Sequence, residues 1–242
     1  NAVIVCDDAR FDLAVTAGVL SAFKTTGQRC VSASRILVQE SLFDRYAEAF
    51  VATAKRLRFG DPLDPSNFAG PLVNPAAVEK VTGYNALART EGVGVLLEGD
   101  RPAGDGCFVP PFVYRTDYRP ELRCLREEVF GPHVALVPFR DDDDAVRIAN
   151  ATEYGLSLAV ITESYRRMRH FRDECEYGMG YVNLPCIGAE VHLPFGGVKK
   201  SGNGHPSAAA LVSAVTHPTA WTVNHGTDIK MAQGLTARLE SE

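Results

Sequence analysis

Short apolar runs alternate with helix-length segments along most of this chain, and this alternation constrains the fold more than any other feature. Runs rich in Val, Ile and Leu predict strands at residues 2–5, 36–38, 93–97, 134–139, 156–161 and 180–183. Apolar residues at helical spacing predict helices at 11–24, 43–57, 75–89, 141–150 and 164–175. Strands that alternate with helices of this length indicate an α/β fold with a mostly parallel, doubly wound sheet.

Local signals refine this pattern. Ser41, with Asp44 three residues later, predicts a capped helix start, and Asn74 before Pro75 predicts another. The acidic run 141–144 is typical of a helix amino terminus, where it caps the helix and complements its dipole. Residues 107–114 read as extended, but Pro110 and Pro111 predict an edge or broken strand there.

The pattern changes near residue 214. Residues 219–223 form one strand-like run with few partners nearby in the sequence, so we expect it to leave the domain and pair with another chain or domain. The sequence therefore predicts a main domain at 1–214 and an oligomerisation strand with its tail at 215–242.

Composition excludes several function classes. The 242 residues are 45% hydrophobic and 23% charged, and the net charge of −5 argues against a nucleic-acid-binding surface. No apolar run approaches membrane-spanning length, and the first residues do not resemble a signal peptide. The six cysteines form no Cys-x-x-Cys pair or zinc pattern, which predicts reduced thiols in the cytoplasm and no metal site.

Cys30 is the first candidate for chemistry. It ends the run Thr-Gly-Gln-Arg-Cys after the helical segment 11–24, and a thiolate there is a strong nucleophile for carbonyl carbons. Gly27 allows a close backbone approach, and the N–H of the cysteine can then face a developing oxyanion. Taken alone, the commoner role of such a residue is a buried, inert thiol.

A second motif reads Glu-Glu-Val-Phe-Gly-Pro at residues 127–132. A carboxylate at Glu128 can accept hydrogen bonds from both hydroxyls of a ribose. In an extended segment, Phe130 lies on the same side as Glu128 and can pack on the ribose or on a ring. The alternative is a solvated acidic loop before a Gly-Pro turn, with Glu127 as a structural residue.

A third motif, Pro-Phe-Gly-Gly at residues 194–197, permits a tight turn with Phe195 projecting beside a ligand. The alternative role of Phe195 is ordinary core packing. Asn183 ends the predicted strand 180–183, just before a loop that leads to this motif.

In this order, the three motifs resemble the catalytic half of the aldehyde dehydrogenase superfamily. The resemblance implies NAD or NADP as the cofactor, an aldehyde substrate, and a homodimer or homotetramer as the full-length assembly. It also implies that the thiol forms a hemithioacetal and then a thioester. The residue roles that it implies are Cys30 as nucleophile, Glu128 and Phe130 as cofactor contacts, and Phe195 and Asn183 as substrate contacts. His205 departs from the Gly-x-Gly-Arg-Glu ending that is commoner in the family.

The resemblance covers only the second half of a typical family member. The family glutamate that activates water for thioester hydrolysis would fall before Asn1, and no Gly-x-Gly-x-x-Gly fingerprint of a dinucleotide fold is present. We therefore expect a fragment that is inactive alone. Two alternatives stay open: a relative that transfers the acyl group to coenzyme A, and a non-catalytic folding or association module.

Overall fold

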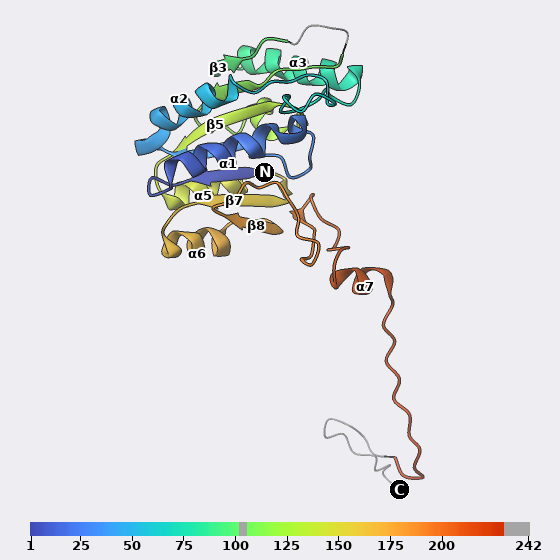
Figure 1. The fold of residues 1–242 in the computed structure, drawn as a ribbon. Helices are drawn as coiled ribbons and strands as arrows, with labels where there is room; N and C mark the ends of the chain where they lie inside the picture. The colour runs from blue at the N-terminus through green and yellow to red at the C-terminus, as the bar shows by residue number, and fades with distance from the viewer. Residues whose placement is uncertain (102–105, 230–242) are drawn as a thin grey trace.

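A computed structural model describes residues 1–101 and 106–229, and its centre is a seven-stranded sheet (Figure 1). The strands lie in the order β3-β4-β5-β2-β1-β7-β8. All neighbouring pairs are parallel except β3 with β4. The strand bounds are β1 (Ala2–Val5), β2 (Arg35–Gln39), β3 (Gly94–Glu98), β4 (Phe112–Arg115), β5 (His133–Phe139), β7 (Ser157–Ile161) and β8 (Met179–Val182). The predicted α/β fold with a mostly parallel sheet is confirmed.

Helices cover both faces of the sheet because successive side chains of a buried strand point to opposite sides. Val3 and Val5 pack with α1 (Phe11–Phe23) and α2 (Phe43–Ala54). Ala2 and Ile4 belong to the opposite core. That core includes side chains of α3 (Pro75–Thr90), α5 (Asp142–Asn150) and α6 (Tyr165–Glu174). The shorter elements are η1 (Lys24–Gly27), η2 (Glu40–Leu42), α4 (Arg123–Arg126), β6 (Tyr154–Gly155), β9 (Val198–Lys199) and α7 (Ala210–Val215).

Two of the three predicted helix starts are confirmed. Asn74 accepts a hydrogen bond from the N–H of Ala77 at 2.9 Å, and Asp141 accepts one from Asp144 at 2.8 Å. The prediction for Ser41 is wrong, because that residue lies inside η2 and α2 begins at Phe43 without a side-chain cap. A residue inside a helical turn does not have the extended backbone that a capping residue needs.

The two prolines break the extended segment but do not place it at an edge. β4 begins at Phe112, directly after Pro111, and lies between β3 and β5. The missing N–H groups of the prolines therefore fall before the first ladder residue, where no sheet hydrogen bond is required. Of the two predicted alternatives, the broken strand is observed and the edge strand is wrong, because the edges of this sheet are β3 and β8.

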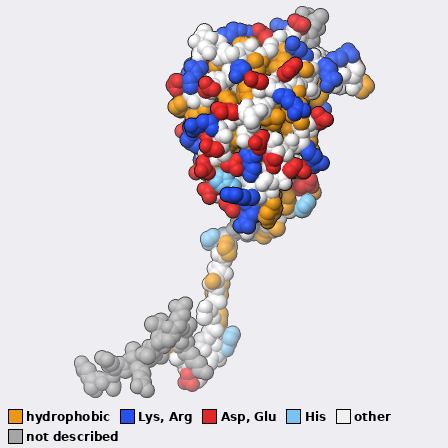
Figure 2. All heavy atoms as spheres, turned by 90° about the vertical axis from the view of Figure 1, so that its left-hand side faces the viewer, with side chains coloured by type: hydrophobic (Ala, Val, Ile, Leu, Met, Phe, Trp, Pro, Cys, Tyr) orange, Lys and Arg blue, Asp and Glu red, His pale blue; other side chains and the backbone are white. Residues whose placement is uncertain are grey.

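After α7 the chain leaves the body as an extended arm (Figure 1). The structure assigns no strand to 219–223, and the side chain of Trp221 is 84% exposed. Figure 2 shows a few hydrophobic side chains along this arm, and a mixture of hydrophobic, acidic and basic side chains over the body. The predicted division at residue 214 stays a prediction, and 230–242 of the predicted tail lie outside the described residues.

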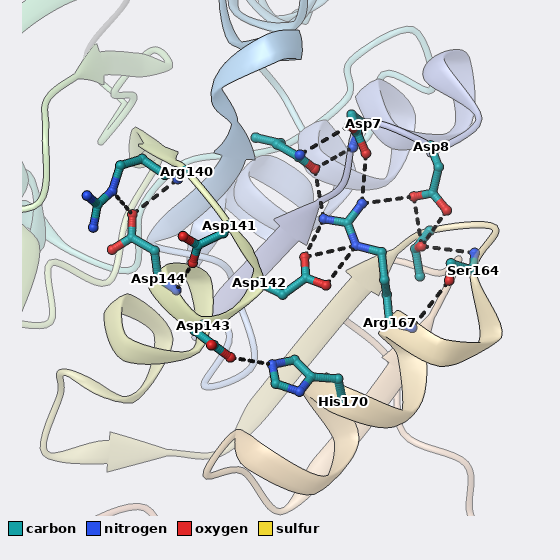
Figure 3. A network of polar contacts seen from close by, with 12 residues as sticks. Asp7, Asp8, Arg140, Asp141, Asp142, Asp143, Asp144, Ser164, Arg167 and His170 are labelled. Carbon is teal, nitrogen blue, oxygen red and sulfur yellow. Dashed lines mark hydrogen bonds and ion pairs between the residues drawn. The ribbon is translucent and has the colours of Figure 1, made fainter.

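At the carboxyl ends of the central strands, Arg167 joins several elements (Figure 3). Its guanidinium donates to Asp7 at 2.8 Å, to Gln39 at 2.8 Å and to Asp142 at 2.9 Å. These contacts connect the segment after β1 and the last residue of β2 with the first turns of α5 and α6. A structural ion-pair network therefore covers the carboxyl-terminal end of the sheet.

Two kinds of feature are absent from the described residues, 1–101 and 106–229. None of their helices combines the length and the apolar character that crossing a membrane requires. None of their His, Cys, Asp and Glu side chains form a group suited to hold a metal ion.

Candidate active site

A cavity of about 80 Å³ lies at the amino-terminal ends of β1, β2, β5 and β7, the edge opposite the Arg167 network. Cys30, Glu128 and Phe130 all line it. The structure thus brings together the predicted nucleophile and both predicted cofactor contacts, although about 100 residues separate them. Asn1, Arg35, Gly131 and His133 also line this cavity.

Cys30 is the exposed thiol among the six cysteines. It lies in the turn Arg29–Ser32, which the Ser32 N–H closes by donating to the Arg29 carbonyl at 2.9 Å. Burial raises the pKa of Cys6, Cys124 and Cys175 to about 12, so these thiols stay protonated near neutral pH. Because the thiolate is the nucleophile, exposure and position together favour Cys30 for chemistry.

The backbone before Cys30 has an unusual conformation. Thr25 and Thr26 have φ values of 56° and 57°, and Gly27 follows with φ +66°. The left-handed region costs a residue with a Cβ about 1–2 kcal/mol, so tertiary contacts must hold these threonines there. The Thr26 hydroxyl donates to the Gly70 carbonyl at 2.9 Å and supplies one such contact.

The two neighbouring glutamates of the second motif have different partners. Arg123 donates to both carboxylate oxygens of Glu127, at 2.7 and 3.1 Å, and the Tyr84 hydroxyl donates to the same carboxylate. These hydrogen bonds lower the pKa of Glu127 to about 2. Within the described ranges, the Glu128 carboxylate has no hydrogen bond or ion pair to another side chain. Glu127 thus anchors the segment and leaves Glu128 as the available acceptor at the cavity.

The expected extended backbone at Phe130 is not observed. Phe130 has φ 60°, so the segment turns there and does not keep the alternation that would place Glu128 and Phe130 on one side. The prediction of an extended segment is wrong at this residue, because the chain must reverse to enter β5 at His133. Phe130 still lines the cavity, and its side chain is 41% exposed.

Phe195 lies in a second, larger cavity of about 510 Å³. Tyr181, Glu190 and His205 line the same cavity. Burial, together with nearby Cys186, Glu190 and Cys30, raises the pKa of Tyr181.

Asn183 is not brought to Cys30 by the structure. It follows β8, at the carboxyl ends of the parallel strands, whereas Cys30 precedes β2 at their amino ends. Its carboxamide accepts from the Thr162 N–H at 3.1 Å and donates to the Thr162 carbonyl at 3.0 Å. With φ 54°, Asn183 reverses the chain, and Cys186 then donates through Sγ to the Val31 carbonyl at 3.1 Å.

Two further residues of the site were not identified from the sequence. The Asn1 carboxamide donates to the carbonyl groups of Cys30 and Ser32. His133 is 3% exposed, its Nδ1 lies 2.8 Å from Asn85 Oδ1, and its Nε2 has no partner among the described residues. Both depend on contacts distant in the sequence, so no local motif marks them.

The sequence pattern described as "Aldehyde dehydrogenase family" matches residues 1–220. The chain belongs to the aldehyde dehydrogenase family. It is 41% identical over 201 residues to succinate-semialdehyde dehydrogenase, mitochondrial, of Oryza sativa, covering 83% of this chain and 38% of the relative. It is 36% identical over 214 residues to betaine aldehyde dehydrogenase of Cereibacter sphaeroides, covering 88% of this chain and 44% of the relative.

Solved aldehyde dehydrogenase structures share the fold. The betaine aldehyde dehydrogenase of Staphylococcus aureus in complex with NAD+ has a TM-score of 0.84 and 30% identity, covering 88% of this chain and 43% of that chain. An NAD-dependent aldehyde dehydrogenase of Sinorhizobium meliloti has a TM-score of 0.84 and 31% identity, covering 92% of this chain and 46% of that chain. The chain spans 38–44% of the length of eight curated relatives that it matches.

Proposed function

We propose that this chain supplies the nucleophile and part of the cofactor site of an NAD(P)-dependent aldehyde dehydrogenase that makes a carboxylate. The observation that carries the proposal is the meeting of Cys30 and Glu128 at one cavity. The exposed thiol, and the carboxylate that has no side-chain partner among residues 1–101 and 106–229, come from segments that precede different strands. A structure of the S. aureus relative with a BME-modified cysteine supports a reactive thiol in this family.

The chemistry of the chain centres on Cys30 Sγ. The thiolate attacks the aldehyde carbon and forms the C–S bond of a hemithioacetal, while the carbonyl electrons move to the oxygen. Backbone N–H groups at the turn stabilise the negative charge on that oxygen. Loss of hydride from the same carbon leaves a thioester on Cys30, and water then releases the carboxylate and regenerates the thiol.

The residues at the cavity fit a dinucleotide. Glu128 offers carboxylate oxygens to two ribose hydroxyls, and Phe130 offers an exposed aromatic face beside it. NAD or NADP, when bound there, supplies the hydride acceptor. The role of Glu127 is to hold the segment through Arg123 and Tyr84.

Phe195 is proposed to line the path of the aldehyde, together with Tyr181 at the second cavity. The contact of Asn183 with substrate stays a prediction, and the Thr162 contacts give this residue a role in shaping the loop after β8. The names of the relatives include succinate-semialdehyde, 3-sulfolactaldehyde and betaine aldehyde dehydrogenases. Because these aldehydes carry groups of opposite charge, the names do not indicate the charge of the substrate of this chain.

Turnover tests the proposal directly. NADH formation is followed by absorbance with succinate semialdehyde, 3-sulfolactaldehyde and betaine aldehyde. The assay compares this chain alone with the polypeptide translated from the whole gene that contains it. We expect turnover in the longer polypeptide and none in this chain alone. If neither polypeptide oxidises aldehyde until coenzyme A is added, the enzyme transfers the acyl group to coenzyme A and does not hydrolyse the thioester. Absence of both turnover and NAD(P) binding would favour a non-catalytic association module.

The assembly and compartment are also proposals. The exposed arm with Trp221 supports the predicted homodimer or homotetramer, because an unpaired apolar segment is stabilised by pairing with another chain. The cytoplasmic location stays a prediction, and the name of the Oryza sativa relative contains the word mitochondrial.

A further inference from the structure

The turn that carries Cys30 has few bonds of its own. The Ser32 N–H donates to the Arg29 carbonyl at 2.9 Å, and the Ser32 hydroxyl accepts from the Arg29 N–H at 3.2 Å. These two bonds close the turn but do not attach it to the sheet. Its orientation relative to the cavity must therefore come from contacts with other segments.

The side chain of Asn1 makes that attachment. Its Nδ2 donates to the Cys30 carbonyl at 2.7 Å and to the Ser32 carbonyl at 2.9 Å. Its Oδ1 accepts from the Ser157 N–H at 2.9 Å. Asn1 directly precedes β1, and Ser157 begins β7, so one carboxamide fixes the turn to two adjacent strands of the sheet.

Only a carboxamide of this length suits these partners. Two carbonyl groups need two N–H donors, and the Ser157 N–H needs an acceptor on the same planar group. An aspartate supplies no donor, and a serine supplies one. The donors and acceptors of the asparagine side chain thus match the three backbone groups in number and type.

These bonds also orient the backbone beside the thiol. In a trans peptide, the carbonyl and the following N–H point in opposite directions. Because the Cys30 carbonyl points to Asn1, the Val31 N–H points away from Asn1. Further hydrogen bonds hold Val31, because its carbonyl accepts from Cys186 Sγ and from the Ser157 hydroxyl. Within the described part of the chain, the N–H groups of Cys30 and Val31 have no acceptor.

We propose that Asn1 is a positioning residue that holds the Cys30 turn in its reactive orientation through its side-chain carboxamide. This inference rests on the proposed function, because it concerns the turn of the proposed nucleophile. A misplacement of about 1 Å in a reacting group can slow a reaction by roughly 100-fold. Asn1 therefore acts on the chemical step through the backbone of the Cys30 turn, which its carboxamide holds.

The test compares Asn1→Ala, Asn1→Asp and Asn1→Gln in the polypeptide used for the turnover assay, with identical upstream residues. The matched control is Asn150→Ala. The Asn150 carboxamide also bridges two backbone groups, the Glu174 carbonyl at 2.9 Å and the Glu176 N–H at 2.8 Å, neither of which belongs to the Cys30 turn. Melting temperatures show which variants are folded, and Asn1→Gln retains the polar groups if Asn1→Ala does not fold.

We expect Asn1→Ala and Asn1→Asp to lower kcat by roughly 10- to 100-fold with little change in KM for aldehyde or NAD(P), and Asn150→Ala to stay within about twofold. Hydrogen exchange of the Ser32 and Ala33 amides should accelerate about tenfold or more in the Asn1 variants alone. Unchanged kcat in folded Asn1→Ala would overturn the proposal. If no variant, including the unaltered chain, turns over aldehyde, the proposed function fails, and unchanged exchange at Ser32 and Ala33 would overturn the role of Asn1 separately.

Discussion

Gly27 packs directly against the carbonyl group of Gly131. A Cβ atom on Gly27 would lie 2.3 Å from that carbonyl oxygen, and Gly27 also has φ +66°. The contact joins the segment before Cys30 to the segment after Glu128. It is therefore the point at which two motifs distant in the sequence become one site.

Gly27→Ala should accordingly destabilise the folded protein. The left-handed conformation and the backbone collision together should lower the free energy of unfolding by about 2–4 kcal/mol. Gly92→Ala is the matched control, because Gly92 has φ +74° but its added Cβ meets no atom of the described residues within 4 Å. We expect a loss of about 1 kcal/mol there. Urea denaturation measures both, and equal losses would show that the Gly131 contact is unimportant.

Cys30→Ser tests the nucleophile. Since a hydroxyl is far less ionised than a thiol at neutral pH, aldehyde oxidation by the longer polypeptide should fall by roughly 10³-fold or more. The melting temperature should change little, because Cys30 is exposed. Cys107→Ser serves as the control and should keep turnover. Near-full activity of the Cys30 variant would remove this residue from the mechanism.

The variants Glu128→Gln and Glu127→Gln distinguish cofactor binding by Glu128 from structural anchoring of the segment by Glu127. Glu128→Gln should raise the dissociation constant of NAD(P) about tenfold, because the ribose hydroxyls lose a charged acceptor. Glu127→Gln removes the partner of Arg123, a partly exposed ion pair, and should lower stability by about 0–1 kcal/mol with a smaller effect on cofactor binding. Calorimetric titration and thermal unfolding measure the two effects. The reverse order of cofactor affinities would exchange the roles assigned to the glutamates.

The sequence was sufficient for the central sheet because each buried strand is a continuous apolar run. The predicted runs at 134–139 and 156–161 correspond to β5 and β7 within one residue. It was not sufficient where tertiary contacts override local preference. The positive φ values of Thr25 and Phe130, and the pairing of β6 with β9, have no local signal in these residue types.

The candidate site divides in the same way. Cys30 and Glu128 can be predicted as candidate site residues from the sequence because their motifs are local. The contact between Asn1 and Cys30 crosses 29 residues, and it was not found. The pairing of Asn183 with Thr162, 21 residues apart, likewise had no signal beside the Gly-Tyr-Val-Asn run.

His133 predicts a pH dependence of stability. Burial lowers its pKa to about 3, whereas an unfolded histidine titrates near 6.5. Between these values the unfolded state binds more protons, so the stabilisation is complete above about pH 6.5 and declines as the pH falls towards 3. The slope from this one residue is at most about 1.4 kcal/mol per pH unit. His133→Gln retains a polar partner for Asn85 and should flatten the decline between pH 6.5 and 4.5, as measured by urea denaturation at several pH values. The same slope in both proteins would assign the acid sensitivity to other groups.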